Sequence, residues 1–577
     1  MNTNMDRRFF LKGTIAAAGA TALVGLTGCA PSGVSSASVK EEMAQTGATQ
    51  QDVTGWRKAP EPVSDIASTT DADIVIIGAG NAGLTAAAAA LDGGAKVVLL
   101  EAKDEVQDSR SWIGAVDSKL QKAAGAAAHA DIDHNEAASE IARMASYVAD
   151  HDLIRLWTDN SGEFMDWFIG IMETQGLNVM LETACKDSIY YNKAVAHHVH
   201  QGVYSPNGEG NSFYHHCLAL KDYVLANGGE IYFKTPAVQL VQDDTGKVTG
   251  VIARDEDGAY AQFNAGKGVV VCTGGYGNNE EMLEDLTTTA HRYCSMNIGA
   301  ERNTGDGIKM LTWAGAAMHP VQETMVFDRG TVMPDQTLGF PMTGGLWYGG
   351  TQPFLRVNAD GERYSNEDQT YDYNFNAAIV QKGHTWWQIF DKNYYADCER
   401  FQCARCSRVA QPEEGDAPMI SYLDGQTPLS AEFLQSQLEG VFSSGAAVQA
   451  DTIEELAELM DVPADALKET VDRYNELWGA QEDTDYGKKA FRLSAIVEPP
   501  FTAVHCAGWL LCTLGGVRVN TDMQPLREDG TAIEGVYVVG NDQGGFYGTV
   551  YPETFGGLNN GKGMTFGYLV GKALAQA

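Results

Sequence analysis

The sequence predicts an α/β fold in which a parallel sheet with helices on its faces is interrupted by a second, α+β unit. Residues 73–91 read as a buried strand, a glycine-rich turn and an alanine-rich helix in succession. Two more apolar strands with glycine turns lie at 268–275 and 535–542. The long stretch between these two has helical patterns of its own, so we expect the chain to leave the parallel sheet and return to it near its C-terminus.

The composition is that of a folded, acidic protein. Of 577 residues, 44% are hydrophobic and 20% are charged, which excludes a wholly disordered chain. The formal net charge is −36, and a surface of that sign repels phosphate backbones and anionic membranes. We therefore expect no nucleic-acid partner, whereas a basic protein partner would be attracted.

The first residues predict export and lipid anchoring. Two arginines followed by phenylalanines at 6–12 are typical of a twin-arginine signal, and 26–29 is similar to a lipoprotein processing box. We expect a signal peptide over 1–28, with Cys29 lipidated, and a flexible tether over 29–65, which is rich in Ser, Ala, Thr and Gln. The protein would then sit on the outer face of the cytoplasmic membrane, held by its lipid alone. The alternative for the first segment is an amphipathic helix.

The order of elements after the tether is that of a dinucleotide site. The apolar run 73–77 predicts a buried parallel strand, and the Gly-x-Gly-x-x-Gly turn at 78–83 leads into a helix over 84–91. A second buried strand over 96–100 ends at Glu101, about 20 residues after the glycines, where a carboxylate can hydrogen-bond a ribose.

Each glycine of the turn has a separate structural role. Gly78 allows the tight turn, Gly80 lets the backbone approach a pyrophosphate, and Gly83 lets the helix pack close to the strand. The helix N-terminus offers N–H groups and the positive end of its dipole to the phosphates. These features together predict dinucleotide binding.

Segments at 268–275, 304–307, 361–367, 473–475 and 535–542 resemble the fumarate reductase/succinate dehydrogenase flavoprotein family, which includes 3-ketosteroid dehydrogenases. The similarity runs from about residue 70 to residue 577. It implies that the cofactor is FAD, bound non-covalently, and not a nicotinamide.

The resemblance also implies a Rossmann-like FAD-binding domain interrupted by an α+β capping domain. The FAD-binding domain would comprise 66–328 and 512–577, and the capping domain 329–511. Near the end of the capping domain we expect two helices, the first opened by a Thr-x-x-Glu capping box at Thr452 and the second by Pro463.

A set of flavin contacts follows from the same resemblance. The strand before Gly540 would reach the ribityl chain, and the glycines at 556–561 would open a helix whose positive end faces flavin N1 and O2. The chain departs from the family's usual Gly-Gly-Asn-Ser/Thr at 107–114. The expected cofactor-binding residues are Gly78, Gly80, Ala82, Gly83, Glu101, Ala102, Ser109, Ser111, Gly114, Val238, Thr273, Gly274, Asp306, Asn541 and Leu558.

The family's dicarboxylate-binding side chains are missing from this chain. Where fumarate-type members have a proton-donating arginine, a histidine and a second arginine, this sequence has Tyr371, Cys512 and Thr554. A dicarboxylate bound without those cations would be desolvated and unpaired, at a large cost in free energy. We therefore exclude fumarate and succinate as substrates.

Ketosteroid dehydrogenases are similar in having a tyrosine at the position of Tyr371 and a Tyr-Pro before a late glycine. Here the latter are Tyr551 and Gly557, two residues further apart than is usual. The resemblance implies that Tyr371 donates a proton, while Tyr551 and the Gly557 N–H polarise a ketone oxygen. A phenol with a pKa of about 10 is neutral at pH 7 and can donate a proton beside an apolar ring. The alternatives are that Tyr371 is a packing aromatic and that Tyr547 replaces Tyr551.

The cysteines do not predict a complete disulfide framework. Ten cysteines less the lipidated Cys29 leave an odd number. Cys398, Cys403 and Cys406 have the first spacings of a plant-type iron–sulfur loop, but no fourth cysteine follows nearby. We expect plain thiols or one disulfide there, and an iron–sulfur cluster is disfavoured.

The histidines at 197–200 and 215–216 could bind a metal, but we expect a polar loop that lines the pocket and no metal. The sequence has no Cys-x-x-Cys-His for covalent haem. Electrons would therefore come from another protein, such as a separate cytochrome or a quinol-linked membrane protein.

Three functions remain open. The first, which we favour, is an exported reductase that transfers a hydride from flavin N5 to a C=C bond conjugated with a carbonyl, in a neutral or weakly charged substrate. The second is a 3-ketosteroid dehydrogenase that runs the reverse reaction. The third is a non-catalytic flavin lipoprotein that carries electrons or binds a ligand.

Overall fold

The computed structural model describes residues 55–106, 112–182, 193–201, 212–213, 216–287, 289–297, 302–401, 419–420 and 431–577. None of the helices in these ranges is long and apolar enough to span a membrane. The expected signal peptide, Cys29, Ser109, Ser111, Cys403, Cys406 and His215 lie outside the described residues.

The first sheet draws its strands from both ends of the described chain. Strand β1 (Ile66–Ile77) pairs in parallel with β2 (Val97–Leu100) and with β10 (Tyr260–Val271), and β10 pairs in parallel with β18 (Val536–Val538). All four residues of β2 are buried, as expected for a parallel strand covered on both faces. The predicted α/β fold and the return of the chain to the sheet are confirmed. The sheet is completed by β7 (Glu230–Tyr232), β8 (Ala237–Gln242) and β9 (Val248–Arg254).

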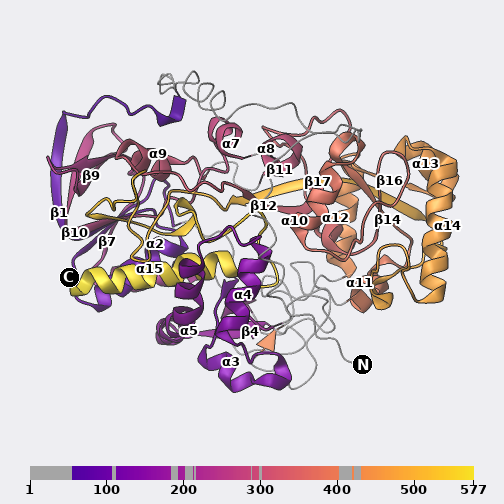
Figure 1. Ribbon diagram of the computed structural model, residues 1–577, viewed down its shortest axis with the longest axis horizontal. Coiled ribbons are helices and arrows are strands. Elements are labelled where there is room, and N and C mark those ends of the chain that lie inside the picture. The colour runs from indigo at the N-terminus through magenta and orange to yellow at the C-terminus, as the bar shows by residue number, and fades with distance from the viewer. Residues whose placement is uncertain are drawn as a thin grey trace, which may run out of the picture. The chain divides into compact units, whose positions relative to one another are not determined.

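Helix α2 (Asn81–Asp92) packs on the last helix, α15 (Leu558–Gln576), and Figure 1 shows the two side by side below the sheet. Small residues let the two backbones approach closely. A Cβ atom on Gly567 would lie 2.4 Å from the Ala82 carbonyl oxygen, and one on Gly571 would lie 2.2 Å from that of Ala86. The helix predicted over 84–91 thus exists, with one further turn at its N-terminus.

The second sheet is organised around β17 (Phe501–Thr513). Strands β11 (Cys294–Asn297) and β12 (Thr324–Thr331) pair with it, although they begin before residue 329, where we expected the capping domain to start. The other strands are β13 (Leu355–Val357), β14 (Trp386–Phe390) and β16 (Ala447–Ala450).

The two helices predicted for the capping domain are confirmed. The Thr452 side chain accepts a hydrogen bond from the Glu455 N–H (3.2 Å) and caps α13 (Ile453–Met460). Helix α14 (Ala464–Ala480) begins directly after Pro463. Both helices lie at one side of the second sheet (Figure 1). Local capping signals therefore placed these two elements correctly.

The third sheet contains most of the histidines that we expected in a polar loop, and that expectation is wrong. Those at 197–200 lie on β5 (Ala196–Gln201), a strand that is buried at His197, His198 and His200, and the buried His216 begins α6 (His216–Ala226). Burial lowers the pKa of His197 to about 4 and that of His200 to about 3, so both are neutral at physiological pH. The other strands are β3 (Ile113–Gly114), β4 (Leu177–Glu182), β6 (Ser212–Phe213) and β15 (Met419–Ile420).

Residues 55–57, inside the expected tether, form a helical turn that packs on the fold. Trp56 is 6% exposed, and its indole N–H donates to Asp285 Oδ2 (3.0 Å) on α7 (Glu280–Leu286). Its backbone N–H donates to Glu281 Oε1 (3.1 Å). A buried tryptophan with two hydrogen bonds holds this end of the segment in place.

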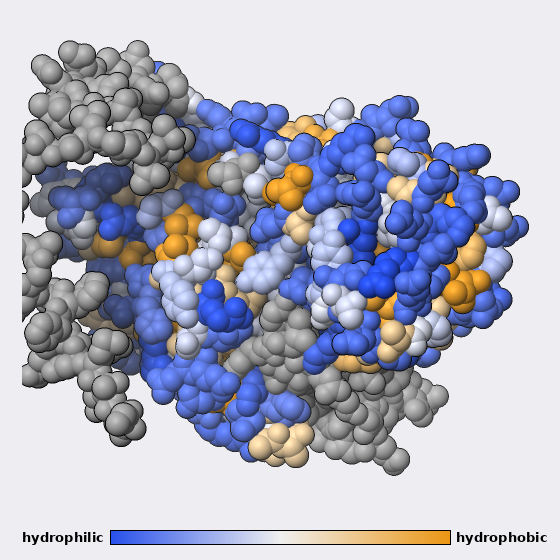
Figure 2. Space-filling view, turned by 45° about the vertical axis from the view of Figure 1, so that its right-hand side comes forward, coloured by the Kyte–Doolittle hydropathy of each residue, from blue (hydrophilic) through white to orange (hydrophobic). Residues whose placement is uncertain are grey.

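The face of the molecule in Figure 2 is mainly hydrophilic, with hydrophobic residues in small separate groups, as the acidic composition predicts. The remaining helices of the described ranges are α3 (Lys119–Ala124), α4 (His134–Met144), α5 (His151–Thr174), α6 (His216–Ala226), α8 (Ala290–Tyr293), α9 (Asp306–Trp313), α10 (Tyr371–Ile379), α11 (Tyr394–Phe401) and α12 (Ala431–Ser443).

Candidate active site

The glycine turn after β1 is shaped by close backbone contacts. Gly78 has a φ of +107°, which favours glycine. A Cβ atom on Gly83 would lie 2.0 Å from the Gly78 carbonyl oxygen and 2.8 Å from Cys272 Sγ. Gly80 is the N-cap of α2 and makes no side-chain capping bond, so this helix end suits a phosphate anion.

Glu101 joins the end of β2 to the glycine turn. Its Oε2 accepts the Ala79 N–H (2.8 Å), and its Oε1 accepts the Lys103 N–H (2.9 Å). Burial raises the pKa of the carboxyl, and these two bonds oppose that shift. The carboxylate thus lies beside the glycine turn, where we expect the ribose.

The turn after β10 is held by a buried carboxylate from the C-terminal part of the chain. Asp542 accepts from the Thr273 backbone N–H and hydroxyl and from the Gly275 N–H (3.2 Å). The Gly307 N–H, at the start of α9, donates to Thr273 Oγ1 (3.0 Å). Asn541 precedes Asp542 in the same turn, Gly540–Asp542. Three expected contact regions, at 273–274, 306 and 541, therefore meet around Thr273.

The remaining expected cofactor contacts differ in exposure. Ala82 is buried in the first turn of α2 and Val238 is half-buried in β8, whereas Ala102 is exposed. Asp306 is the first residue of α9 and is half-exposed. Gly274 has a φ of +101°, which again favours glycine.

Strand β3 contacts the start of α15. The Gly114 N–H donates to the Gly557 carbonyl oxygen (2.8 Å), and a Cβ atom on Gly114 would lie 2.9 Å from the Gly556 oxygen. Gly557 is the N-cap of α15 with a φ of +72°, and Leu558 begins the helix and is buried. This helix end, whose N-cap residue makes no side-chain capping bond, is the one expected to face flavin N1 and O2.

Two tyrosine-bearing segments are joined by reciprocal hydrogen bonds. The Tyr371 backbone N–H donates to Glu553 Oε2 (2.7 Å), and the Tyr551 backbone N–H donates to Asp372 Oδ2 (2.6 Å). Each segment therefore supplies one tyrosine and the carboxylate that holds the other segment's tyrosine. The structure thus brings together Tyr371 and Tyr551, which are far apart in sequence.

Both tyrosine side chains have defined surroundings. The Tyr371 ring is 4% exposed and lies against Phe327, with ring centroids 4.2 Å apart. The Tyr551 hydroxyl oxygen accepts the Asn559 N–H (3.1 Å) in the first turn of α15. The Tyr547 hydroxyl donates to Asn559 Oδ1 (3.1 Å), so this alternative tyrosine belongs to the same network. The Tyr551 hydroxyl and Gly557 therefore meet at one helix end.

Asp372 is a buried carboxyl within this site. Burial raises its pKa to about 8, and the nearby charge of Glu553 adds to the rise. The backbone N–H groups of Tyr551 and Val326 donate to its two oxygens, and these hydrogen bonds lower the pKa in part.

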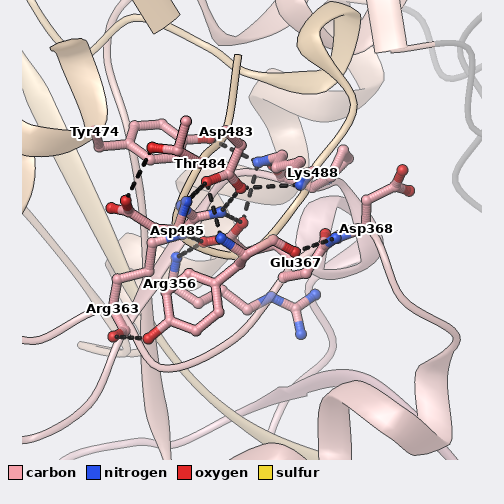
Figure 3. Close-up of polar contacts among 12 residues, drawn as sticks. Arg356, Arg363, Glu367, Asp368, Tyr474, Asp483, Thr484, Asp485 and Lys488 are labelled. Atoms are coloured by element: carbon pink, nitrogen blue, oxygen red, sulfur yellow. Dashed lines mark hydrogen bonds and ion pairs between the residues drawn. The ribbon is translucent and has the colours of Figure 1, made fainter. Parts of the chain in front are cut away.

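A buried ion network fixes the segment that leads to Tyr371 (Figure 3). Arg363 pairs with Glu367 (2.8 Å) and with Asp483 (2.8 Å), and Lys488 Nζ lies 3.2 Å from Glu367 Oε2. Burial raises the pKa of Glu367, but the Lys488 and Arg363 charges outweigh it and hold the pKa below its ordinary value. The 361–367 motif thus fixes the part of the chain that leads into α10.

Four residues of the site, Asp372, Glu553, Asn559 and Lys562, were not predicted from the sequence. Asp372 and Glu553 act through contacts between segments that are distant in sequence, which a pattern along the chain does not reveal. Asn559 contacts Tyr547 and Tyr551 nearby in the chain, but no motif marks it. Lys562 did carry a signal, since it is the only charged residue between Glu553 and Lys572 in an otherwise apolar and glycine-rich stretch.

The chain matches a family model described as FAD binding domain over residues 73–555. It is similar to a vinyl phenol reductase of Lactiplantibacillus plantarum, with 26% identity over 511 residues that cover 87% of this chain and 96% of the relative. It is also similar to a digoxin reductase of Eggerthella lenta, with 26% identity over 569 residues that cover 94% and 93%.

Among solved structures, the chain is similar to a 3-ketosteroid delta1-dehydrogenase from Sterolibacterium denitrificans in complex with 1,4-androstadiene-3,17-dione. The TM-score is 0.68 at 17% identity, and the match covers 88% of this chain and all of that one (100%). At this identity the likeness shows the fold.

Proposed function

Because this chain belongs to the FAD binding domain family and is an FAD-dependent oxidoreductase, we propose that it reduces a C=C bond conjugated with a carbonyl group in a neutral or weakly charged organic substrate. The family is that of the fumarate reductase and succinate dehydrogenase flavoproteins. The relatives named as vinyl phenol and digoxin reductases support the direction of reduction.

The described residues fit FAD. The uncapped N-terminus of α2 suits the pyrophosphate, and Glu101 lies beside that turn for the ribose. The turn at Thr273 and the segment at Asn541 would hold the flavin end. When bound, FAD supplies a hydride from its N5 atom.

One observation carries the choice of substrate: the reciprocal bonds that bring Tyr371 and Tyr551 together are made by two buried or half-buried carboxyls, Asp372 and Glu553. A carboxylate brought there as substrate would be repelled by the charge of Glu553, while Asp372, whose pKa is about 8, offers it no compensating cation. At the two other positions where the family binds dicarboxylates, Cys512 contacts Asn559 and Thr554 contacts Met144, so neither position supplies a cation. A neutral enone meets no such penalty.

The tyrosines then have separate tasks. Tyr371, held by Phe327 and by its own N–H, donates the proton to the α-carbon. Tyr551, whose oxygen accepts the Asn559 N–H, donates to the carbonyl oxygen together with the Gly557 N–H. The positive end of α15 stabilises the negative charge that develops on that oxygen.

The experiment is an anaerobic assay with a reduced dye as electron donor. Neutral enones, cinnamates and steroids are offered to the purified protein, and fumarate serves as the charged control. Reduction of a neutral enone without reduction of fumarate supports the proposal. Oxidation of a 3-ketosteroid with an artificial acceptor, without enone reduction, would favour the reverse dehydrogenase, and no turnover in either direction would favour an electron carrier.

A further inference from the structure

Lys562 is a buried cation without a carboxylate partner among the residues that the structure describes. Its side chain is 0% exposed, and its Nζ donates to the Gly540 carbonyl oxygen (2.7 Å). No ion pair to it occurs in the described ranges. An ammonium group removed from water is costly unless an anion compensates it. Burial lowers the pKa of Lys562 to about 7, and the nearby Cys512 and Asp542 only partly oppose that shift.

The position of Lys562 points to the cofactor. Gly540 opens the turn that contains Asn541 and Asp542, and Asp542 holds the turn at Thr273. Lys562 therefore lies next to the segment expected to contact the flavin end of FAD. A negative charge that forms on the cofactor beside this turn would compensate the positive charge of Lys562.

The side chain extends toward the tyrosine side of the site. Its Nζ lies 5.3 Å from the centroid of the Tyr547 ring, and the Tyr547 hydroxyl donates to Asn559. Asn559 in turn holds the Tyr551 hydroxyl. Gly540 also lies close to the first turn of α2, since a Cβ atom on it would lie 3.5 Å from the Ala82 Cβ, so the test must distinguish the flavin ring from the pyrophosphate expected at Gly80.

We propose that Lys562 pairs with the negative charge that the flavin ring acquires on reduction, and thereby stabilises reduced FAD over oxidised FAD. Uptake of two electrons and one proton, supplied by an external electron donor, leaves the ring with one negative charge at N1 and O2. The ammonium group of Lys562 adds a full charge to the partial charge of the α15 N-terminus. The inference rests on FAD binding and not on the identity of the substrate.

The test compares Lys562→Met and Lys562→Gln with Lys572→Met in the full chain. Lys572 lies on the same helix and pairs with Glu163 at the surface (2.6 Å), so it is a matched control. The dissociation constant of oxidised FAD is measured by titration, and the midpoint potential by equilibration with a reference dye. Neither measurement uses the substrate, so a failure of the enone proposal leaves the result intact.

For both Lys562 variants we expect oxidised FAD to bind within about threefold of the unmodified protein and reduced FAD to bind about 100-fold more weakly. That ratio corresponds to a potential lower by about 59 mV, at 29.6 mV per tenfold for a two-electron couple. Sulfite, which adds to oxidised flavin and leaves the same ring charge, should also bind about 100-fold more weakly. Lys572→Met should match the unmodified protein in all three measurements.

An unchanged potential in a variant that holds FAD would overturn the proposal. Equal weakening of oxidised and reduced FAD would overturn it too, and would assign Lys562 to the pyrophosphate. If Lys562→Met fails to fold, Lys562→Gln decides, because it keeps a hydrogen-bond donor for Gly540 and removes only the charge. Loss of oxidised FAD from a folded Lys562→Gln would likewise contradict the proposal.

Discussion

Tyr371 and Tyr551 are held in different ways. The ring of Tyr371 packs on Phe327, whereas the hydroxyl of Tyr551 accepts a backbone N–H at a helix end. A change that removes only a hydroxyl oxygen therefore leaves the packing of Tyr371 intact and isolates its chemistry.

We predict that Tyr371→Phe lowers turnover by about 10²–10⁴-fold, the usual contribution of a general acid. FAD content and substrate binding should barely change, because the ring still contacts Phe327 and the backbone N–H still binds Glu553. Anaerobic steady-state kinetics on the best enone measure the effect. Near-normal turnover would move the proton donor to Tyr547 or Tyr551.

Asp372 should make stability depend on pH. Its pKa is raised from 3.8 to about 8 in the folded protein, so the folded state keeps a proton that the unfolded state releases. Stability therefore falls as pH rises between about 4 and 8, by at most about 1.4 kcal/mol per pH unit from this group. Asp372→Asn should flatten that fall, although it weakens one of the two backbone hydrogen bonds. Denaturant unfolding across this pH range measures both effects.

Asp472→Asn serves as the control, since Asp472 forms an exposed pair with Lys468 (2.5 Å). Its stability should follow the pH dependence of the unmodified protein. A slope in Asp372→Asn equal to that of the control would show that Asp372 is ionised in the folded state.

Single residues were predictable from the sequence where their partners are near in the chain. Gly83 lies against Gly78, and Glu101 accepts the Ala79 N–H, so all three belong to one strand–helix–strand unit. Their spacing along the sequence was therefore enough to identify them. Asp372 and Glu553 contact each other's segments over separations of 179 and 182 residues, and no local pattern carries that information.

At the scale of elements, helices α2 and α15 are packed so closely that they tolerate only glycine at certain positions. We predict that Gly571→Ala destabilises the protein by about 1–3 kcal/mol, because the new methyl group would lie 2.2 Å from the Ala86 carbonyl oxygen. Gly479→Ala in α14 meets nothing within 4 Å and should instead stabilise by up to about 1 kcal/mol. Thermal unfolding of the two variants checks both signs, and equal shifts would contradict the packing.

Elements with local signals were predicted well, and those without were not. Thr452 and Pro463 placed α13 and α14 through their capping roles. The histidine run at 197–200 reads as polar, yet it forms β5. Ser118 and a backbone oxygen bind the imidazole of His197, and Glu182 binds that of His198, inside the third sheet. Tertiary hydrogen bonds overrode the local polarity there.

For the whole molecule, the sequence was informative about the first sheet and much less so about the second. The unit β1–α2–β2 of the first sheet is contiguous in sequence, whereas β17 pairs with strands that begin as early as Cys294. Pairings between distant segments, such as β10 with β18 or β11 with β17, leave no period or spacing in the sequence.

Membrane attachment also belongs to this scale. If Cys29 carries the lipid, Cys29→Ser should leave export intact and release the protein from the membrane, since one lipid would be the whole anchor. Cell fractionation followed by a salt wash measures this. A variant that stays in the washed membrane fraction would contradict lipid anchoring at Cys29.

The reciprocal bonds between the two tyrosine segments have a consequence for how such a protein can evolve. Tyr371 and Asp372 come from one segment, and Tyr551 and Glu553 come from the other. A recombination event that imports one segment without its acid would break one of the two bonds and free the tyrosine of the other segment, since both donors are backbone N–H groups. We therefore expect either segment to be exchangeable only for one that has an acid at the same position.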